Sequence, residues 1–341
     1  MVAAHKDLLA DIVGGDPHAQ RRSMAKAITL LESTRADHRA QADELLSQLL
    51  PHTGNSLRVG LSGVPGVGKS TLIEALGLWL IDKGHKVAVL AIDPSSSVSG
   101  GSILGDKTRM EHLSVHPSAF IRPSPSSGNL GGVAEKTREC MMVCEAAGYD
   151  IVLVETVGVG QSETAVAGMT DMFVLMQLPN AGDDLQAIKK GVMELADLIV
   201  INKSDIDQDA ATRAESFIQS ALHLLGHHNS LATPTWKPQV MCLSALQGSG
   251  LSELWDKVLQ YKQLQMDGGQ WVRKRQSQAL TWMNERIESG LREAFTQHAG
   301  VAAALSHMQQ EVLSGRVAAS TAARQLLALA SKPTTGSQIK T

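Results

Sequence analysis

The residues of this chain with the clearest chemistry form a glycine-rich stretch that ends in a lysine and a serine. Positions 63–70 read G-V-P-G-V-G-K-S, the G-x-x-x-x-G-K-[ST] pattern of a phosphate-binding loop. Glycines let the backbone turn tightly, so that successive N–H groups converge on an anion, and the positive end of the following helix adds to them. The lysine would offer a charge to the β- and γ-phosphates, and the serine hydroxyl would ligate Mg²⁺. The predicted phosphate site comprises Gly63, Val64, Pro65, Gly66, Val67, Gly68, Lys69, Ser70 and Thr71.

A second motif predicts which base the site reads. Asn202-Lys203-Ser204-Asp205 follows the apolar run 198–201 and has the N-K-x-D pattern of the guanine-reading element of GTPases. The Asp205 carboxylate could accept from both N1–H and the exocyclic amine of guanine, whereas adenine presents no such donor pair. Lys203 could lie along the base, and Asn202 could tie neighbouring loops together. Ser244, Ala245 and Leu246 fit the second base-contacting loop, so the expected nucleotide is GTP or GDP.

Acidic residues placed at strand ends predict the metal side of the site. Glu155 ends an apolar run, Asp93 ends another, and Asp106 follows a glycine-rich segment. Carboxylates and hydroxyls suit Mg²⁺, so we expect Asp93 and Glu155, which end strands, on the metal side together with Ser70. Asp106 taken alone is more typical of a turn carboxylate that caps a helix or solvates a loop. Gly158 would let the backbone approach the γ-phosphate.

Short apolar runs that alternate with helical segments set the expected fold. Such alternation predicts an α/β protein with a mostly parallel, doubly wound sheet, whose ligand lies beyond the carboxyl ends of the strands. The expected strands are 57–61, 86–92, 119–122, 150–155, 172–178, 198–202 and 240–243. The expected domains are an N-terminal helical extension (1–55), a P-loop G domain (56–267), a C-terminal helical hairpin (268–331) and a disordered tail (332–341).

The C-terminal segment predicts two amphipathic helices, from 271 to about 295 and from 301 to about 331. Leu280, Met283, Ile287 and Leu291 recur at helical spacing and make one apolar stripe. Such a stripe outside a complete core either packs on the same chain or forms the interface of a homodimer.

Composition limits the other classes. A formal net charge of −3 argues against nucleic acid as a partner, because counterion displacement needs a basic surface. Three cysteines are too few for a disulfide framework and suit a reducing compartment. No apolar run approaches the roughly 20 residues of a membrane span, and no secretory signal is evident at the N-terminus. We therefore expect a cytoplasmic protein without membrane contact.

Taken together, the motifs resemble one family of GTPases. Besides the phosphate loop, the resemblance rests on D-P-S-S at 93–96, G-D-K-T-R-M at 105–110, R-P-S-P at 122–125, E-T-V-G-V-G-Q-S at 155–162 and D-L-Q-x-I-K-K-G at 184–191. The chain is identified by them as similar to the MeaB/ArgK-type P-loop GTPases, the bacterial relatives of the human methylmalonic aciduria type A protein. The resemblance covers nearly the whole chain, including both helical extensions.

The resemblance implies a homodimeric G-protein chaperone of adenosylcobalamin-dependent methylmalonyl-CoA mutase, which gates cofactor delivery and protects the enzyme. It implies that segment 180–190 is a loop that orders when a partner binds, and that Lys189 can reach the nucleotide and aid hydrolysis. Mg²⁺ and GTP would be the bound cofactor and substrate, and the resemblance implies that Asp106 joins Asp93 and Glu155 around the metal. An older description of the family, a small-molecule kinase or ATPase of arginine and ornithine transport, is the alternative, and N-K-x-D argues against an ATPase.

Overall fold

The structure is a computed structural model. The chain forms two compact units, Met1–Arg275 and Gln276–Thr341. It describes residues 2–33, 35–92, 110–123, 130–156, 162–179, 190–224 and 236–331. Four of the predicted site residues, Asp93, Asp106, Gly158 and Lys189, lie outside the described residues.

The described part of the first unit is built on a seven-stranded sheet with the order β3-β2-β4-β1-β5-β6-β7, in which every neighbouring pair is parallel. Because all strands run the same way, their carboxyl ends meet at one edge. This confirms the predicted parallel, doubly wound α/β fold. The strands are β1 (Leu57–Gly63), β2 (Val87–Ile92), β3 (Ala119–Arg122), β4 (Ile151–Thr156), β5 (Met172–Gln177), β6 (Leu198–Ile201) and β7 (Gln239–Cys242).

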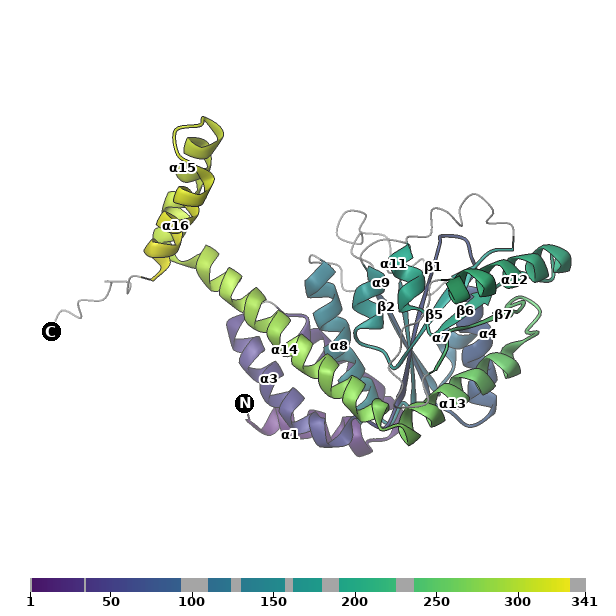
Figure 1. The fold of residues 1–341 in the computed structure, drawn as a ribbon. Helices are drawn as coiled ribbons and strands as arrows, with labels where there is room; N and C mark the ends of the chain where they lie inside the picture. Colours follow the sequence, from purple (N-terminus) through teal and green to yellow (C-terminus); the bar gives the residue numbers. More distant parts are fainter. Residues whose placement is uncertain are drawn as a thin grey trace. The chain divides into compact units, whose positions relative to one another are not determined.

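The strands are largely apolar because helices cover both faces of the sheet. Alternate residues of β5 show this. Met172 and Val174 belong to one buried cluster, whereas Phe173 and Leu175 belong to the other. Figure 1 shows α8 and α9 on the opposite side of the strands from α4.

The two covering layers differ in their makeup. The layer over the Phe173 face comprises α1 (Val2–Gly14), α2 (Pro17–Leu31), α3 (Ala36–Leu49), α8 (Leu130–Ala146), α9 (Ser162–Ala167), α11 (Lys190–Leu195) and α12 (Gln208–Leu224). The layer over the Met172 face comprises α4 (Lys69–Asp82), α7 (Glu111–Val115) and α13 (Leu251–Asp267). A single turn, η1 (Leu50–His52), leads from α3 towards β1. The N-terminal helices are therefore part of the main core rather than a separate body.

Three helices follow α13. They are α14 (Gln270–Gln297), α15 (Ala299–Leu313) and α16 (Ala319–Ala330). The single helix expected from 301 to about 331 is wrong, because the chain turns between α15 and α16. Gly315 there has φ +71°, a left-handed conformation that suits glycine, and Arg316 N donates to Glu311 O at 3.0 Å to close the turn.

Among the described residues, none of the helices combines the length and the apolar character that crossing a bilayer requires.

Candidate functional site

The phosphate-loop sequence lies between β1 and α4, at the carboxyl edge of the sheet. Two of its glycines are required by close approaches. A Cβ on Gly63 would lie 2.6 Å from the Met176 carbonyl oxygen, and one on Gly68 would lie 2.5 Å from the Asn202 side-chain nitrogen. Gly68 also has φ +97°, and Leu72 N donates to its carbonyl at 2.9 Å to begin α4. The loop therefore presses directly against β5 and the segment after β6.

Lys69 is buried, and its ammonium is folded back onto the loop. Nζ donates to the Gly63 carbonyl oxygen at 2.7 Å and to the Val64 carbonyl oxygen at 3.3 Å. A buried cation needs acceptors close by, and the loop carbonyls provide them here. Phosphate oxygens could replace these carbonyls as acceptors if the Lys69 ammonium turned away from them towards the mouth of the loop.

The serine of the motif faces Glu155, the acid one residue before the end of β4. Ser70 Oγ donates to Glu155 Oε1 at 3.3 Å, and Glu155 is 7 % exposed. The sheet register explains this meeting, because Glu155 pairs with Leu61 two residues before β1 ends. A hydroxyl and a carboxylate side by side form the oxygen donor set that Mg²⁺ takes. Their partners in the predicted metal set, Asp93 and Asp106, are not among the described residues.

Asn202 joins three loops. It is buried directly after β6, its Nδ2 donates to the Val67 carbonyl at 2.8 Å, and its Oδ1 accepts from Ala245 N at 3.0 Å. One side chain thus connects the phosphate loop to the loop after β7. The sequence predicted a tie between loops at this residue, and the structure identifies Val67 and Ala245 as its partners.

The rest of the N-K-x-D segment opens outward from this joint. Lys203 has φ +62°, and its side chain runs beside Gly68. Such a conformation is uncommon for lysine and here directs the stem along the phosphate loop. Asp205 is exposed, as is Leu246 at 81 %, whereas Ser244 is buried and its Oγ accepts from Gln247 N at 3.2 Å. The carboxylate of Asp205 is therefore accessible to a base.

One contact beneath the site escaped the sequence analysis. Thr156 Oγ1 donates to Ser62 Oγ at 2.9 Å, and both residues are fully buried. The pair fastens the end of β4 to the end of β1 directly below the phosphate loop. No sequence spacing predicts it, because two hydroxyls 94 positions apart meet only through the register of the sheet.

The described part of the candidate site gathers three features at the carboxyl edge of the sheet. It presents a glycine-rich loop with a buried lysine, a hydroxyl–carboxylate pair and an exposed carboxylate on the far side of one asparagine joint. These three features lie at the carboxyl ends of β1, β4 and β6, with β5 between β1 and β6, so a ligand with a charged end and a base end could span them.

Comparison with known proteins agrees with this arrangement. A family model described as "Methylmalonyl Co-A mutase-associated GTPase MeaB" matches residues 24–299. GTPase ArgK of Escherichia coli is 49 % identical over 82 % of this chain and 84 % of its own. The mitochondrial methylmalonic aciduria type A homolog of Mus musculus is 47 % identical over 90 % of this chain and 76 % of its own. A solved structure described as a LAO/AO transport system kinase superposes with a TM-score of 0.74 at 37 % identity, covering 96 % of this chain and 97 % of that one.

Proposed function

We propose that this chain, which belongs to the MeaB family of methylmalonyl-CoA mutase-associated GTPases, uses its GTPase cycle to gate adenosylcobalamin delivery to methylmalonyl-CoA mutase and to protect that enzyme. The chain is a GTP hydrolase, as its named GTPase relatives are. The match over residues 24–299 carries the proposal of the mutase as partner. Asn202 links the phosphate loop to the loop after β7, and this link supports a guanine nucleotide whose hydrolysis sets the timing of the cycle.

In this proposal Lys69 leaves the carbonyls of Gly63 and Val64 and binds the β- and γ-phosphates. Loop N–H groups hold the same oxygens, with Thr71 at the start of the helix. Ser70 and Glu155 would hold Mg²⁺, with Asp93 and Asp106 around it. When bound, Mg²⁺ would neutralise charge that develops on the phosphate oxygens.

Guanine would lie on the other side of the joint. Asp205 would accept from N1–H and the exocyclic amine, and the Lys203 stem would lie along the base. Ser244, Ala245 and Leu246 would form the second wall of the base pocket. Adenine would leave the carboxylate of Asp205 without its donor pair, which gives the expected preference for GTP over ATP.

The partner would act through segment 180–190. We propose that the mutase orders this segment and brings the Lys189 ammonium to the transferring phosphoryl group, where it offsets developing charge. Each ten-fold of acceleration corresponds to about 1.4 kcal/mol of barrier, which one repositioned charge can supply. Hydrolysis alone would then be slow, and the complex would be fast.

Phosphate release with and without the mutase tests this function. We expect purified methylmalonyl-CoA mutase from the same organism to accelerate GTP hydrolysis in the presence of Mg²⁺. Lys189→Ala loses most of the acceleration but keeps basal turnover, and Lys190→Ala, the neighbouring lysine, is the matched control. No complex and no change in rate would remove the chaperone role while leaving the GTPase intact. Product analysis covers the alternative, because a kinase would transfer the phosphoryl group to an acceptor other than water.

Assembly is part of the proposal. The stripe on α14 is open to solvent, since Leu280, Met283, Ile287 and Leu291 are 59 %, 52 %, 51 % and 66 % exposed. Four large apolar side chains on one helix face form the kind of surface that association buries. We propose a homodimer that uses this face, and a cytoplasmic location, which suits three cysteines that are all free.

A further inference from the structure

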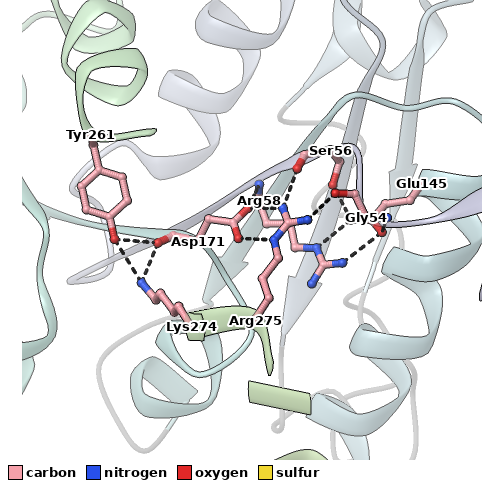
Figure 2. A network of polar contacts seen from close by, with 8 residues as sticks. All are labelled: Gly54, Ser56, Arg58, Glu145, Asp171, Tyr261, Lys274 and Arg275. Atoms are coloured by element: carbon pink, nitrogen blue, oxygen red, sulfur yellow. Dashed lines mark hydrogen bonds and ion pairs between the residues drawn. The ribbon is translucent and has the colours of Figure 1, made fainter. Parts of the chain in front are cut away.

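A network of charges occupies the amino ends of the strands, opposite the nucleotide site. Figure 2 shows its core. We call the full set the base network, where base means the amino end of the sheet and not a nucleobase. Its members are Gly54, Ser56, Arg58, Glu145, Asp171, Asp197, Tyr261, Lys274 and Arg275. All of them belong to the first structural unit. Neither the sequence motifs nor the proposed nucleotide chemistry uses any of them.

Arg275, in the second turn of α14, binds the segment that leads into β1. Its Nε and Nη2 donate to the two oxygens of Asp171, each at 2.7 Å, and Nη2 also donates to the Ser56 carbonyl at 2.6 Å. Its Nη1 donates to the Gly54 carbonyl. The Asp171 side chain is only 2 % exposed. A planar guanidinium can satisfy four acceptors in this way, whereas a lysine cannot.

Asp171 in turn is hydrogen-bonded to β1. Its Oδ2 accepts from Arg58 N at 2.8 Å, and its own N–H donates to the Arg58 carbonyl at 2.8 Å. The Arg58 side chain in turn forks onto Glu145 of α8 at 2.6 and 3.0 Å. The first residues of β1 are therefore held from both sides by buried charge pairs.

Lys274, one residue earlier on α14, reaches the next strands of the sheet. Its Nζ donates to the Asp171 carbonyl and to Tyr261 Oη, and lies 3.8 Å from Asp197 Oδ2. Asp197 directly precedes β6 and accepts from Phe173 N of β5 at 2.9 Å. Two adjacent residues of one helix thus brace the amino ends of β1, β5 and β6.

These same three strands carry the nucleotide site at their other ends. They are adjacent in the sheet, with β5 between β1 and β6. The phosphate loop follows β1, the guanine-reading segment follows β6, and a bound nucleotide would span the two. Continuous hydrogen-bonded pairing, from Val59↔Met172 to Gly63↔Met176 and from Val174↔Leu198 to Gln177↔Ile201, lets each strand move as one body. A change in strand spacing at one edge would then be felt at the other.

We propose that the base network couples the two edges of the sheet. Through it, the nucleotide bound at the carboxyl edge sets the geometry of the first two turns of α14 at the amino edge. Coupling is reciprocal, so a change at Arg275 alters nucleotide affinity although it does not touch the nucleotide. The proposal rests on guanine nucleotide binding and not on the mutase. Arg275 acts here as a positioning residue.

Hydrogen exchange of the wild-type protein tests the coupling without any substitution. The amides of Arg58, Asp171, Lys274 and Arg275 are followed in protein that is free, bound to GDP, or bound to a non-hydrolysable GTP analogue with Mg²⁺. We expect their exchange rates to differ at least about five-fold between the two nucleotides, the lower end of usual coupling. The amides of β3, at the sheet edge away from α14, are the control. Equal exchange in both nucleotide states, with saturation shown by calorimetry, overturns the proposal.

Arg275→Lys tests the reciprocal direction. It keeps the charge but loses the fork, and Arg273→Lys, on the exposed side of the same turn, is the matched control. We expect the ratio of the GDP and GTP-analogue dissociation constants to change at least about five-fold in Arg275→Lys and to stay unchanged in Arg273→Lys. A lower melting temperature with an unchanged ratio of the two dissociation constants would show that the network only stabilises the fold, and it would overturn the proposal. Both constants are measured without the mutase, so this result is independent of the chaperone test.

Discussion

Replacing Asn202 by alanine tests whether the phosphate loop and the base loops act as one site. The change removes two buried hydrogen bonds and leaves the Val67 carbonyl and the Ala245 N–H without their partner. Each stranded group costs about 1–3 kcal/mol, hence about 2–6 kcal/mol for the pair. In the free protein the loops can relax and admit water. Binding must close them again, so we expect at least the lower figure to appear in affinity.

A loss of about 2 kcal/mol of binding free energy raises the dissociation constant roughly 30-fold. Isothermal titration calorimetry with GDP measures it, and Asn284→Ala, an exposed asparagine on α14, is the control for an asparagine change that leaves the site intact. An unchanged GDP affinity in Asn202→Ala would refute the idea that this side chain holds the loops in their binding arrangement.

A double-mutant cycle with Gly68 sharpens this test. Alanine at position 68 would bring its Cβ to 2.5 Å from the Asn202 nitrogen and would also strain a backbone with φ +97°. The strain costs about 1–2 kcal/mol in any background, whereas the clash disappears when Asn202 is alanine. Gly68→Ala should therefore weaken GDP binding less in the Asn202→Ala protein than in the wild type. Additive effects would show that the two residues do not meet during binding.

Four further outcomes follow from the site and the base network. Asp205→Asn should weaken GTP and favour xanthosine triphosphate in competition assays, and equal wild-type affinity for ATP and GTP would contradict the guanine assignment. Lys69→Ala should abolish phosphate release, whereas Glu155→Ala should mainly raise the Mg²⁺ concentration needed. Ending the chain after Arg275 should give a monomer in light scattering that still binds GTP; a surviving dimer would move the interface away from the α14 stripe. Burial raises the pKa of Glu145, but hydrogen bonds from Arg58 and Ser56 outweigh it and leave the pKa below its ordinary 4.5. The native carboxylate therefore stabilises the fold above pH 4.5 and loses this effect as pH falls through the lowered pKa. Glu145→Gln should cost about 3 kcal/mol at pH 7 in urea unfolding, with a gap to wild type that narrows below pH 4.5.

The sequence predicted the parallel sheet because its strands follow local patterns. Runs such as 151–154 and 172–176 are apolar at every position, which is typical of strands covered on both faces. The helical break at Gly315 was missed, because the apolar residues on both sides keep a loose helical spacing across the turn. Three charged residues of the base network gave no signal at all. Glu145, Asp171 and Arg275 are far apart in sequence, and only the folded topology brings them together.

The base network also changes where the G domain ends. A cut at the Gly268-Gly269 pair follows the composition of the sequence, yet it would remove Lys274 and Arg275 and leave the buried carboxylate of Asp171 without its cations. Breaking a buried charge pair from one side costs about 3–5 kcal/mol, a large share of the stability of an ordinary domain. Asp171 lies between the strands that lead to the phosphate loop and to the guanine segment, so this cost would reach the nucleotide site through β1 and β6. A chain that ends at 267 should therefore bind GTP more weakly than one that ends at 275, although every nucleotide motif is present in both. Equal affinities would mean that the amino edge of the sheet and the nucleotide edge are independent.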